Sequence, residues 1–206
     1  MDIDFYFDPS CPFCWVTSRF VLLASNKRKI NINWRLFSLA IKNGELDEES
    51  KKGFDHMPAH RIERVMLAAN KQGIDLGEIY KQFGIMHFIS GEEYNDELIS
   101  SVLKQMKLDQ NLLDAADDKS LDDELNKSTN EAVGIVGQDI GVPTMVFTTE
   151  DGRKTGFFGP VILSLPDVDE AAKQWDALVT LASSSNFYEL KRGREGGPDV
   201  FSTAKC

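Results

Sequence analysis

The stretch that decides the fold is residues 8–15, Asp8-Pro9-Ser10-Cys11-Pro12-Phe13-Cys14-Trp15. A strand-like run at residues 3–7 leads into it, and a helix-like run at residues 16–26 follows it. Two cysteines separated by two residues at the start of a helix can bring their sulfurs together across one helical turn. The unpaired N–H groups and the dipole of a helix N-terminus favour a thiolate at Cys11. The stretch therefore predicts a dithiol redox site.

The chemistry expected of this site is thiol–disulfide exchange. The thiolate of Cys11 attacks a disulfide or another electrophile, and Cys14 then resolves the mixed adduct. A Cys-X-X-Cys motif beside a strand–helix pattern is typical of thioredoxin-like proteins. We therefore interpret Cys11 and Cys14 as catalytic residues.

Two other interpretations of the cysteine pair stay open. In the first, the pair is half of a zinc site, which needs two further ligands. The remaining candidate ligands are one cysteine and three histidines: Cys206, His56, His60 and His87. His56 and His60 lie four residues apart on an expected helix, but the chain has no second paired-cysteine motif, so we predict no metal site. In the second, both cysteines are inert buried apolar residues.

Length and composition limit the classes of protein to which the chain can belong. A chain of 206 residues can bury the core of one domain, with or without a large insertion. Its 42% hydrophobic and 27% charged residues are ordinary for a soluble protein. The net charge of −10 argues against nucleic acid or an anionic membrane as the main partner. No apolar run has the length of a membrane span.

The beginning of the sequence and its cysteine usage suggest a compartment. The acidic start enters a strand at once, without a basic segment or an apolar leader, so we expect a cytoplasmic protein. Structural disulfides are rare in a reducing cytosol, which favours a catalytic role for the paired cysteines. Cys206, near the end of the sequence, is taken as incidental.

The first part of the chain predicts a β-α-β unit. Residues 30–36 alternate strictly between apolar and polar side chains, which is typical of a half-buried strand. Together with the strand and helix around the cysteines they complete the opening unit of a thioredoxin-like fold in residues 1–42. Residues 43–137 contain apolar residues at helical spacing, and we expect an inserted bundle of four to six helices there.

The strand signal returns after Gly141. Residues 143–148 and 154–158 predict a hairpin, and residues 168–183 predict an amphipathic helix. A short helical piece is expected at residues 187–190. The fold class is therefore α/β, with a thioredoxin-like domain built from residues 1–42 and 138–206 and a large all-helical insertion at residues 43–137.

Residues 140–145, Ile140-Gly141-Val142-Pro143-Thr144-Met145, form the second informative stretch. Thioredoxin-like folds place a cis-proline loop facing the dithiol at the head of such a strand. The competing interpretation is a trans proline that simply opens a strand, where proline is allowed. With a dithiol upstream and a helical segment between, we predict a cis bond at Pro143. The backbone of Val142 would then pair with an extended substrate.

The chain resembles the DsbA-like branch of the thioredoxin superfamily, in which a helical domain interrupts the fold. Within that branch it is similar to the mycothiol-dependent nitroreductase (mycoredoxin-like) family. The matching residues are 7–15, 17–19, 38–41, Asn43, 139–144, 157–161 and 187–192. The resemblance implies that Cys11 is the nucleophile and Cys14 the resolving thiol. It also implies that a low-molecular-weight thiol, mycothiol or glutathione, is the reductant, with no tightly bound cofactor.

The same resemblance implies a set of substrate- or thiol-binding residues: Pro12, Phe13, Trp15, Asn43, His87, Val142 and Pro143. Pro12 and Phe13 are expected to tune the gap between the sulfurs and the apolarity around them. The family usually has tryptophan at the position of Phe13 and often threonine at that of Val142. Asn43 matches a family residue near the site. His87 lies near a family histidine, and its other interpretation is an ordinary histidine at a helix end.

Two other functions compete with a thiol-dependent reductase of disulfides or small electrophiles such as nitro compounds. One is a kappa-type glutathione transferase or 2-hydroxychromene-2-carboxylate isomerase, which has serine at the position of Cys11. Those enzymes tend to have a Gly-X-Asp-Arg turn where this chain has residues 159–162, Gly159-Pro160-Val161-Ile162. The other is a binding protein that uses the groove around Pro143 without turnover.

The expected electron source is a thiol or a partner reductase, because the chain has no Gly-rich phosphate loop and no dinucleotide fingerprint. An exposed apolar strip on the helical insertion would permit a dimer.

Overall fold

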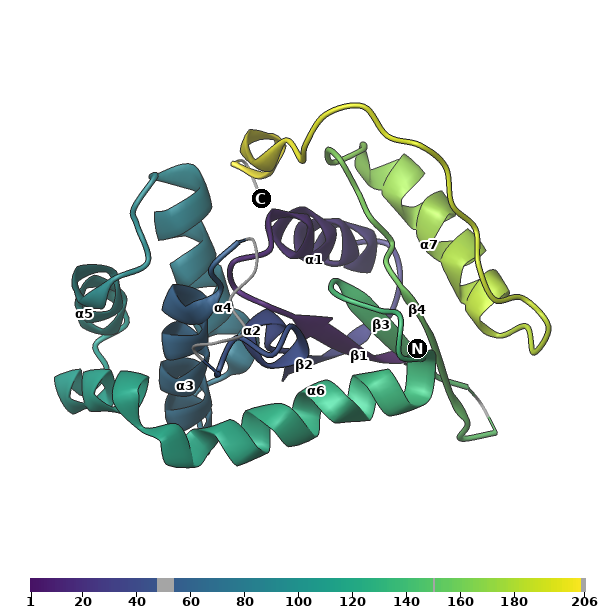
Figure 1. Cartoon of the computed structure of the whole chain (residues 1–206). Helices are drawn as coiled ribbons and strands as arrows, with labels where there is room; N and C mark the ends of the chain where they lie inside the picture. Colours follow the sequence, from purple (N-terminus) through teal and green to yellow (C-terminus); the bar gives the residue numbers. More distant parts are fainter. Residues whose placement is uncertain (48–53, 150, 205–206) are drawn as a thin grey trace. The chain divides into compact units, whose positions relative to one another are not determined.

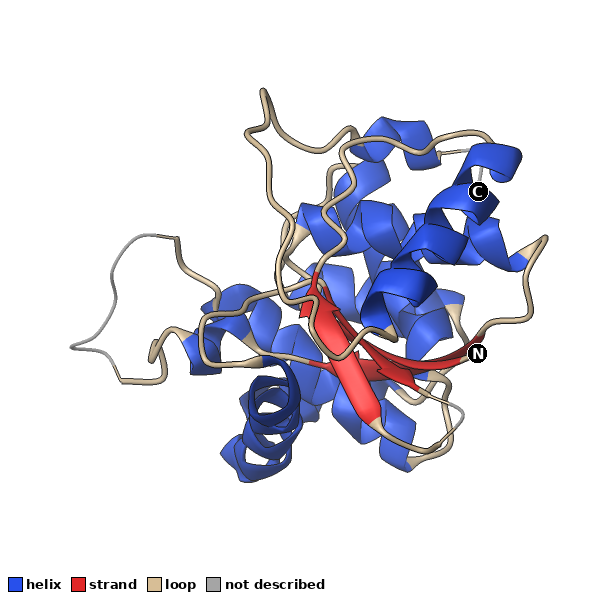
Figure 2. Ribbon diagram, turned by 90° about the vertical axis from the view of Figure 1, so that its right-hand side faces the viewer, coloured by secondary structure: helices blue, strands red, loops and turns tan. Residues whose placement is uncertain are grey.

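The computed structural model describes residues 1–47, 54–149 and 151–204. Its sheet has the strand order β2-β1-β3-β4, formed by β1 (Asp2–Phe7), β2 (Asn31–Leu36), β3 (Thr144–Thr148) and β4 (Lys154–Phe158). β3 runs antiparallel to both neighbours, with Met145 opposite Phe5 of β1 and Phe157 of β4. Residues 3–7 of β1 are all buried, as expected for an inner strand. Figure 2 shows the strands of the sheet in red.

Helix α1 (Pro12–Ser25) begins inside the cysteine motif, four residues earlier than the helix-like run in the sequence. Proline is pre-organised for the first helical position, and Cys11 takes the N-cap position before it. The helix buries Val16, Phe20 and Val21, whereas Leu23 is partly exposed.

The chain divides into two compact units. The first comprises residues 1–6, residues 11–33 and the chain from Ala132 onward. In this unit α1 packs against α7 (Val168–Ala182), and Trp175 of α7 lies 5.8 Å from Phe147 of β3, ring centre to ring centre. The predicted hairpin and the predicted helix at residues 168–183 are therefore confirmed.

The second unit comprises residues 7–10 and 34–131 and is mainly helical (Figure 1). Its elements are α2 (Leu39–Lys42), α3 (Met57–Lys71), α4 (Leu76–Gly84), the π-helix η2 (Ile85–Ile89), α5 (Asp96–Gln105), the 3-10 helices η3 (Gln110–Asp117) and η4 (Lys119–Leu121), and most of α6 (Asp122–Val136). α3 buries Ile62, Val65, Met66 and Ala69, the face that the periodicity predicts. The domain limits at residues 42/43 and 137/138 stay a prediction.

The C-terminal segment differs from the sequence expectation. Residues 187–190 form no helix, because Phe187 packs against Phe157 while Tyr188 and Leu190 are each 82% exposed and offer no buried face. The segment ends instead in the 3-10 helix η5 (Val200–Thr203), which packs against α1.

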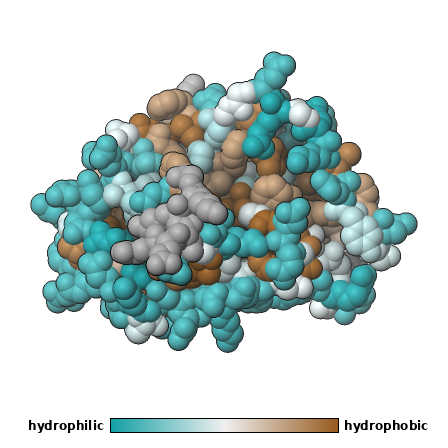
Figure 3. Space-filling model, in the orientation of Figure 1, coloured by the Kyte–Doolittle hydropathy of each residue, from teal (hydrophilic) through white to brown (hydrophobic). Residues whose placement is uncertain are grey.

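Polar side chains predominate on the face of the molecule seen in Figure 3, where hydrophilic residues are drawn in teal. Among the described residues of the predicted insertion, the exposed large apolar side chains are Leu46 and Phe54, and the dimer stays a prediction. No helix in the described part of the chain is long and apolar enough to cross a bilayer.

Gly156 provides a test of the sheet. It lies opposite Val146, and a Cβ at this position would overlap the carbonyl oxygen of Met145 in the neighbouring strand. Replacing Gly156 with alanine is expected to lower the free energy of unfolding by about 1–3 kcal/mol, the usual cost of overpacking. This change in the free energy of unfolding is measured by urea denaturation, with circular dichroism as the signal.

Gly134 of α6 supplies the matched control. A Cβ there would meet nothing within 4 Å, so Gly134→Ala should be neutral or stabilising, by up to about 1 kcal/mol. Equal effects of the two substitutions would contradict the strand pairing of β3 with β4.

Candidate active site

Cys11 lies at the N-cap of α1, where the backbone supports a charged sulfur. The backbone N–H of Cys14 points at the Sγ of Cys11 with an N···S distance of 3.4 Å. Cys11 is 8% exposed and Cys14 is fully buried. An N–H donor together with the helix dipole stabilises negative charge on the Cys11 sulfur. The dithiol expected from the sequence thus sits at a helix start.

The loop before β3 lies against the Cys11 sulfur. The Sγ of Cys11 donates to the carbonyl oxygen of Val142 at 3.5 Å, although the two residues are 131 positions apart. The peptide bond between Val142 and Pro143 is cis, as predicted. A second cis bond precedes Pro160, which the sequence reasoning did not predict. The Pro143 carbonyl accepts a bond from the Gly159 N–H at 2.7 Å, which ties the loop to the end of β4.

The chain around the cysteines is held by buried contacts. The indole N–H of Trp15 donates to the Oγ1 of Thr203 at 2.8 Å, and the guanidinium of Arg19 lies 4.4 Å from the centre of a Trp15 ring. Trp15 is 1% exposed, so these contacts fix the first turn of α1. Pro12 and Phe13 are partly exposed. Their roles, and that of Trp15, in binding a substrate or thiol stay predictions.

Asp8 organises the loop that enters the motif, and it belongs to the second unit. Its buried carboxylate accepts bonds from the backbone N–H of Ser10 and of Leu39, each at 2.8 Å. Burial raises the pKa of Asp8, and these hydrogen bonds oppose that rise. The neighbouring Pro9 carbonyl accepts a bond from the hydroxyl of Tyr94 at 2.6 Å. The sequence reasoning missed these loop-positioning roles.

A model of one protein family matches most of the chain. The family is described as Rv2466c-like, mycothiol-dependent nitroreductase Rv2466c, and the match covers residues 10–192. The chain belongs to this family. It is also 29% identical over 198 residues to the uncharacterized protein Rv2286c of Mycobacterium tuberculosis (strain ATCC 25618 / H37Rv), covering 92% of this chain and 81% of that protein.

Solved structures show the same fold. The cytosolic disulfide reductase DsbM from Pseudomonas aeruginosa superposes with a TM-score of 0.58 at 16% identity, covering 88% of this chain and all (100%) of that one. The probable DsbA oxidoreductase SCO1869 from Streptomyces coelicolor gives 0.56 at 15% identity and covers 97% of each chain. The predicted DsbA-like thioredoxin fold is confirmed. With the family membership, the chain is a thiol-dependent oxidoreductase.

The two predicted site residues of the second unit have partners within that unit. The amide of Asn43 donates to Glu45 at 3.2 Å. His87 stacks on Tyr94 with ring centres 3.8 Å apart, and its Nδ1 lies 2.7 Å from the Glu92 carbonyl oxygen. Burial lowers the pKa of His87, so the ring is neutral at physiological pH. Because Tyr94 also bonds to Pro9, His87 is linked to the loop before Cys11; its role in binding stays a prediction.

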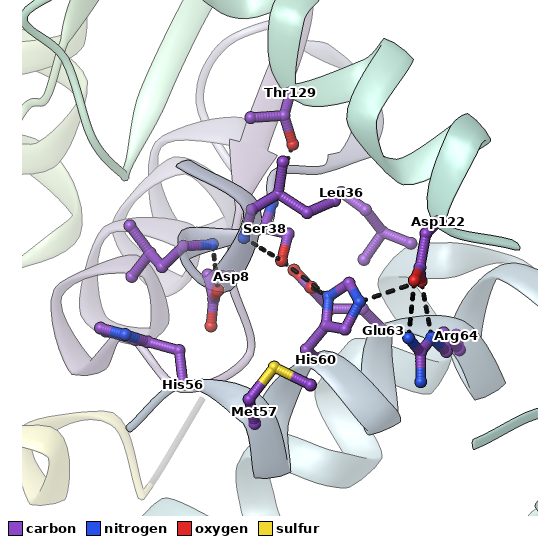
Figure 4. Close-up of polar contacts among 12 residues, drawn as sticks. Asp8, Leu36, Ser38, His56, Met57, His60, Glu63, Arg64, Asp122 and Thr129 are labelled. Atoms are coloured by element: carbon purple, nitrogen blue, oxygen red, sulfur yellow. Dashed lines mark hydrogen bonds and ion pairs between the residues drawn. The ribbon is translucent and has the colours of Figure 1, made fainter. Parts of the chain in front are cut away.

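A buried polar cluster in the second unit was not expected from the sequence (Figure 4). His60 contacts three oxygens: its Nε2 lies 3.0 Å from Asp122, and its Nδ1 lies 2.8 Å from Ser38 and 3.1 Å from Glu63. Arg64 binds the Asp122 carboxylate with two hydrogen bonds, at 2.6 and 2.7 Å. These partners fix His60 in the protein, and no group of potential metal ligands occurs among the described residues.

Charges in this cluster are set by burial and by Arg64. Burial lowers the pKa of His60, and the charge of Arg64 adds to that effect. Burial opposes the charge of Asp122, but the hydrogen bonds from Arg64 hold its pKa below the usual range. Burial raises the pKa of Glu63 well above the usual range, and the Oε1 of Glu63 has no hydrogen-bond partner in the described structure. Burial therefore favours the uncharged form of Glu63, as it does for His60.

Proposed function

We propose that this enzyme uses Cys11 and Cys14 to reduce disulfides or small electrophiles, nitro compounds among them, with mycothiol as the electron donor. The observation that carries the proposal is the position of Cys11, at the N-cap of α1 and beside the Val142 carbonyl, with the Cys14 N–H directed at its sulfur. Membership of a mycothiol-dependent family supports the choice of thiol. The family description also supports nitro compounds as one substrate class.

The reaction with a disulfide proceeds in three balanced steps. The Cys11 thiolate attacks one sulfur of the substrate, forming a mixed disulfide and releasing the other sulfur as a thiolate. Cys14, deprotonated, then attacks the Cys11 sulfur, so that an internal disulfide forms and the second substrate thiolate leaves. Two molecules of the low-molecular-weight thiol reduce the internal disulfide and become a disulfide themselves.

The neighbouring residues have separate tasks in this proposal. Phe13 and Pro12 form an apolar surface beside the sulfurs, and Val142 and Pro143 present the backbone along which a substrate lies. Trp15 holds the first turn of α1 in place through Thr203. Asn43 and His87 are proposed to contact the thiol or the substrate. A partner reductase and a cytoplasmic location remain parts of the proposal.

The choice of thiol is tested by steady-state reduction of one disulfide with mycothiol, with glutathione and without a thiol. We expect kcat/KM with mycothiol to exceed that with glutathione by about tenfold or more, a preference of about 1.4 kcal/mol. A structure of DsbM with GSH exists, so glutathione is a fair competitor. Turnover that needs neither thiol, or no turnover with either, would contradict the proposal. A chromene-carboxylate isomerase would be inactive in this assay, and a binding protein would bind the disulfide without turnover.

A further inference from the structure

The C-terminal segment, residues 184–204, returns to the start of α1 (yellow in Figure 1). Contacts with the rest of the unit hold this segment near its beginning and near its end. Phe187 packs edge-on against Phe157 of β4, with ring centres 5.7 Å apart. Further along, the Asp199 N–H donates to the Leu163 carbonyl at 2.6 Å. The buried Thr203 then accepts the bond from Trp15, the residue directly after Cys14. The path of this segment is therefore tied to the dithiol turn.

Between these attachments the segment places a cation over the ring of Phe13, which lies between the two cysteines in the sequence. The guanidinium carbon of Arg194 lies 4.5 Å from the ring centre of Phe13, the residue just before Cys14. A guanidinium that lies over an aromatic ring can present its N–H edge to a planar oxyanion. Phe13 is partly exposed and Arg194 is exposed, so a ligand can reach this edge from solvent.

Arg194 differs from most of the other arginines in its partners. Arg28, Arg35, Arg61, Arg64 and Arg153 each form an ion pair with a carboxylate. Within the part of the chain that the structure describes, Arg194 forms no ion pair, although acidic residues outnumber basic ones by 33 to 23. A guanidinium without an acidic partner, lying over the ring of the residue directly before Cys14, is suited to bind an anion brought by the substrate.

We propose that Arg194 is a specificity-determining residue that selects substrates with a carboxylate close to the reacting atom. This inference rests on the proposed function, because it concerns the first step of the same exchange. The carboxylate accepts two hydrogen bonds from the guanidinium edge while the Cys11 thiolate attacks the neighbouring sulfur. The bonds made and broken are those of the disulfide exchange described above, and Arg194 contributes only binding and orientation.

The test is the first step alone, measured by stopped flow with the pre-reduced enzyme and no added thiol. The probes are dithiobis(nitrobenzoate), a disulfide with two carboxylates, and dithiobis(nitropyridine), its neutral counterpart. For Arg194→Gln we expect the second-order rate constant with the anionic disulfide to fall about tenfold, the value of a hydrogen bond to a charged group. The rate constant with the neutral disulfide should change by less than about twofold.

Two further variants sharpen the result. Arg194→Lys keeps the positive charge but lacks the planar guanidinium, and it should retain part of the preference for the anionic disulfide over the neutral one. Arg192→Gln removes an equal charge two residues away in the same exposed segment and should leave the ratio of the two rate constants unchanged.

Three outcomes would overturn the assignment. An equal loss with both disulfides would show that Arg194 acts on the Cys11 thiolate, and no loss with either would show that it does not act at all. Failure of the proposed function has a different signature, because Cys11→Ser would then react with both disulfides as fast as the wild-type enzyme does. That result would overturn this inference together with the function.

Discussion

Replacing Cys11 with serine is expected to abolish turnover, lowering kcat/KM for disulfide reduction by at least about a thousandfold, as for other lost nucleophiles. A serine hydroxyl is not ionised near neutral pH, so the N–H of Cys14 and the dipole of α1 have no anion to stabilise. The variant should keep its fold, because serine has nearly the shape of cysteine and is a preferred N-cap residue. Circular dichroism and thermal unfolding check the fold, and a coupled disulfide assay checks the activity.

Cys14→Ser is the matched partner of this variant and should behave differently. The Cys11 thiolate still attacks, but the mixed adduct has no internal thiol to resolve it. Peptide mass mapping should therefore find substrate or thiol on Cys11 of the Cys14→Ser variant, released by excess dithiothreitol, and none on Cys14 of the Cys11→Ser variant. An adduct on Cys14 of Cys11→Ser instead would reverse the two roles, and activity retained by Cys11→Ser would refute the dithiol mechanism.

The fold could be predicted because its decisive signals are local. The spacing of Cys11 and Cys14, the alternation at residues 30–36 and the motif before Thr144 each lie within a few consecutive residues, and each fixes a local backbone preference. Val142 and Cys11 are 131 positions apart in the sequence, and their contact could be expected only from the resemblance to thioredoxin-like folds, which place a cis-proline loop facing the dithiol.

Features that depend on the path of the chain could not be predicted. The contact of Arg194 with Phe13 requires the course of the whole C-terminal segment, and the basic run at residues 191–194 was its only trace in the sequence. The expected helix at residues 187–190 was wrong for the same reason, since Phe187 finds its partner on a distant strand. Local periodicity carries no information about either contact.

Glu63 is a residue whose burial could not be expected from its type. Glutamate is almost never fully buried without a partner, and its place on α3 beside the apolar position Ile62 suggests only the edge of a face. The structure buries it fully, with Oε2 3.1 Å from His60 and Oε1 without a partner in the described chain. With Nε2–H of His60 donating to Asp122, Nδ1 is an acceptor, and a protonated Glu63 can supply the hydrogen.

This protonation makes stability depend on pH with a definite sign. Burial raises the pKa of Glu63 well above its usual 4.5, so the folded chain keeps a proton that the unfolded chain releases. The contribution of Glu63 is fully present below about pH 4.5 and is lost as pH rises toward the folded pKa, by up to about 1.4 kcal/mol per pH unit. His60 acts in the opposite sense, because burial lowers its pKa and its contribution is lost as pH falls below 6.5.

Glu63→Gln is therefore expected to gain stability relative to wild type as pH increases from about 5 to about 8, since glutamine needs no proton to stay neutral. Urea denaturation at several pH values measures this difference, and the slope due to His60 should remain in both proteins. Glu93→Gln, at an exposed position, is the control, and its curve of stability against pH should run parallel to that of the wild type. Parallel curves for Glu63→Gln would mean that the folded protein releases this proton as readily as the unfolded chain, and that the His60 cluster holds a second carboxylate charge beside Asp122.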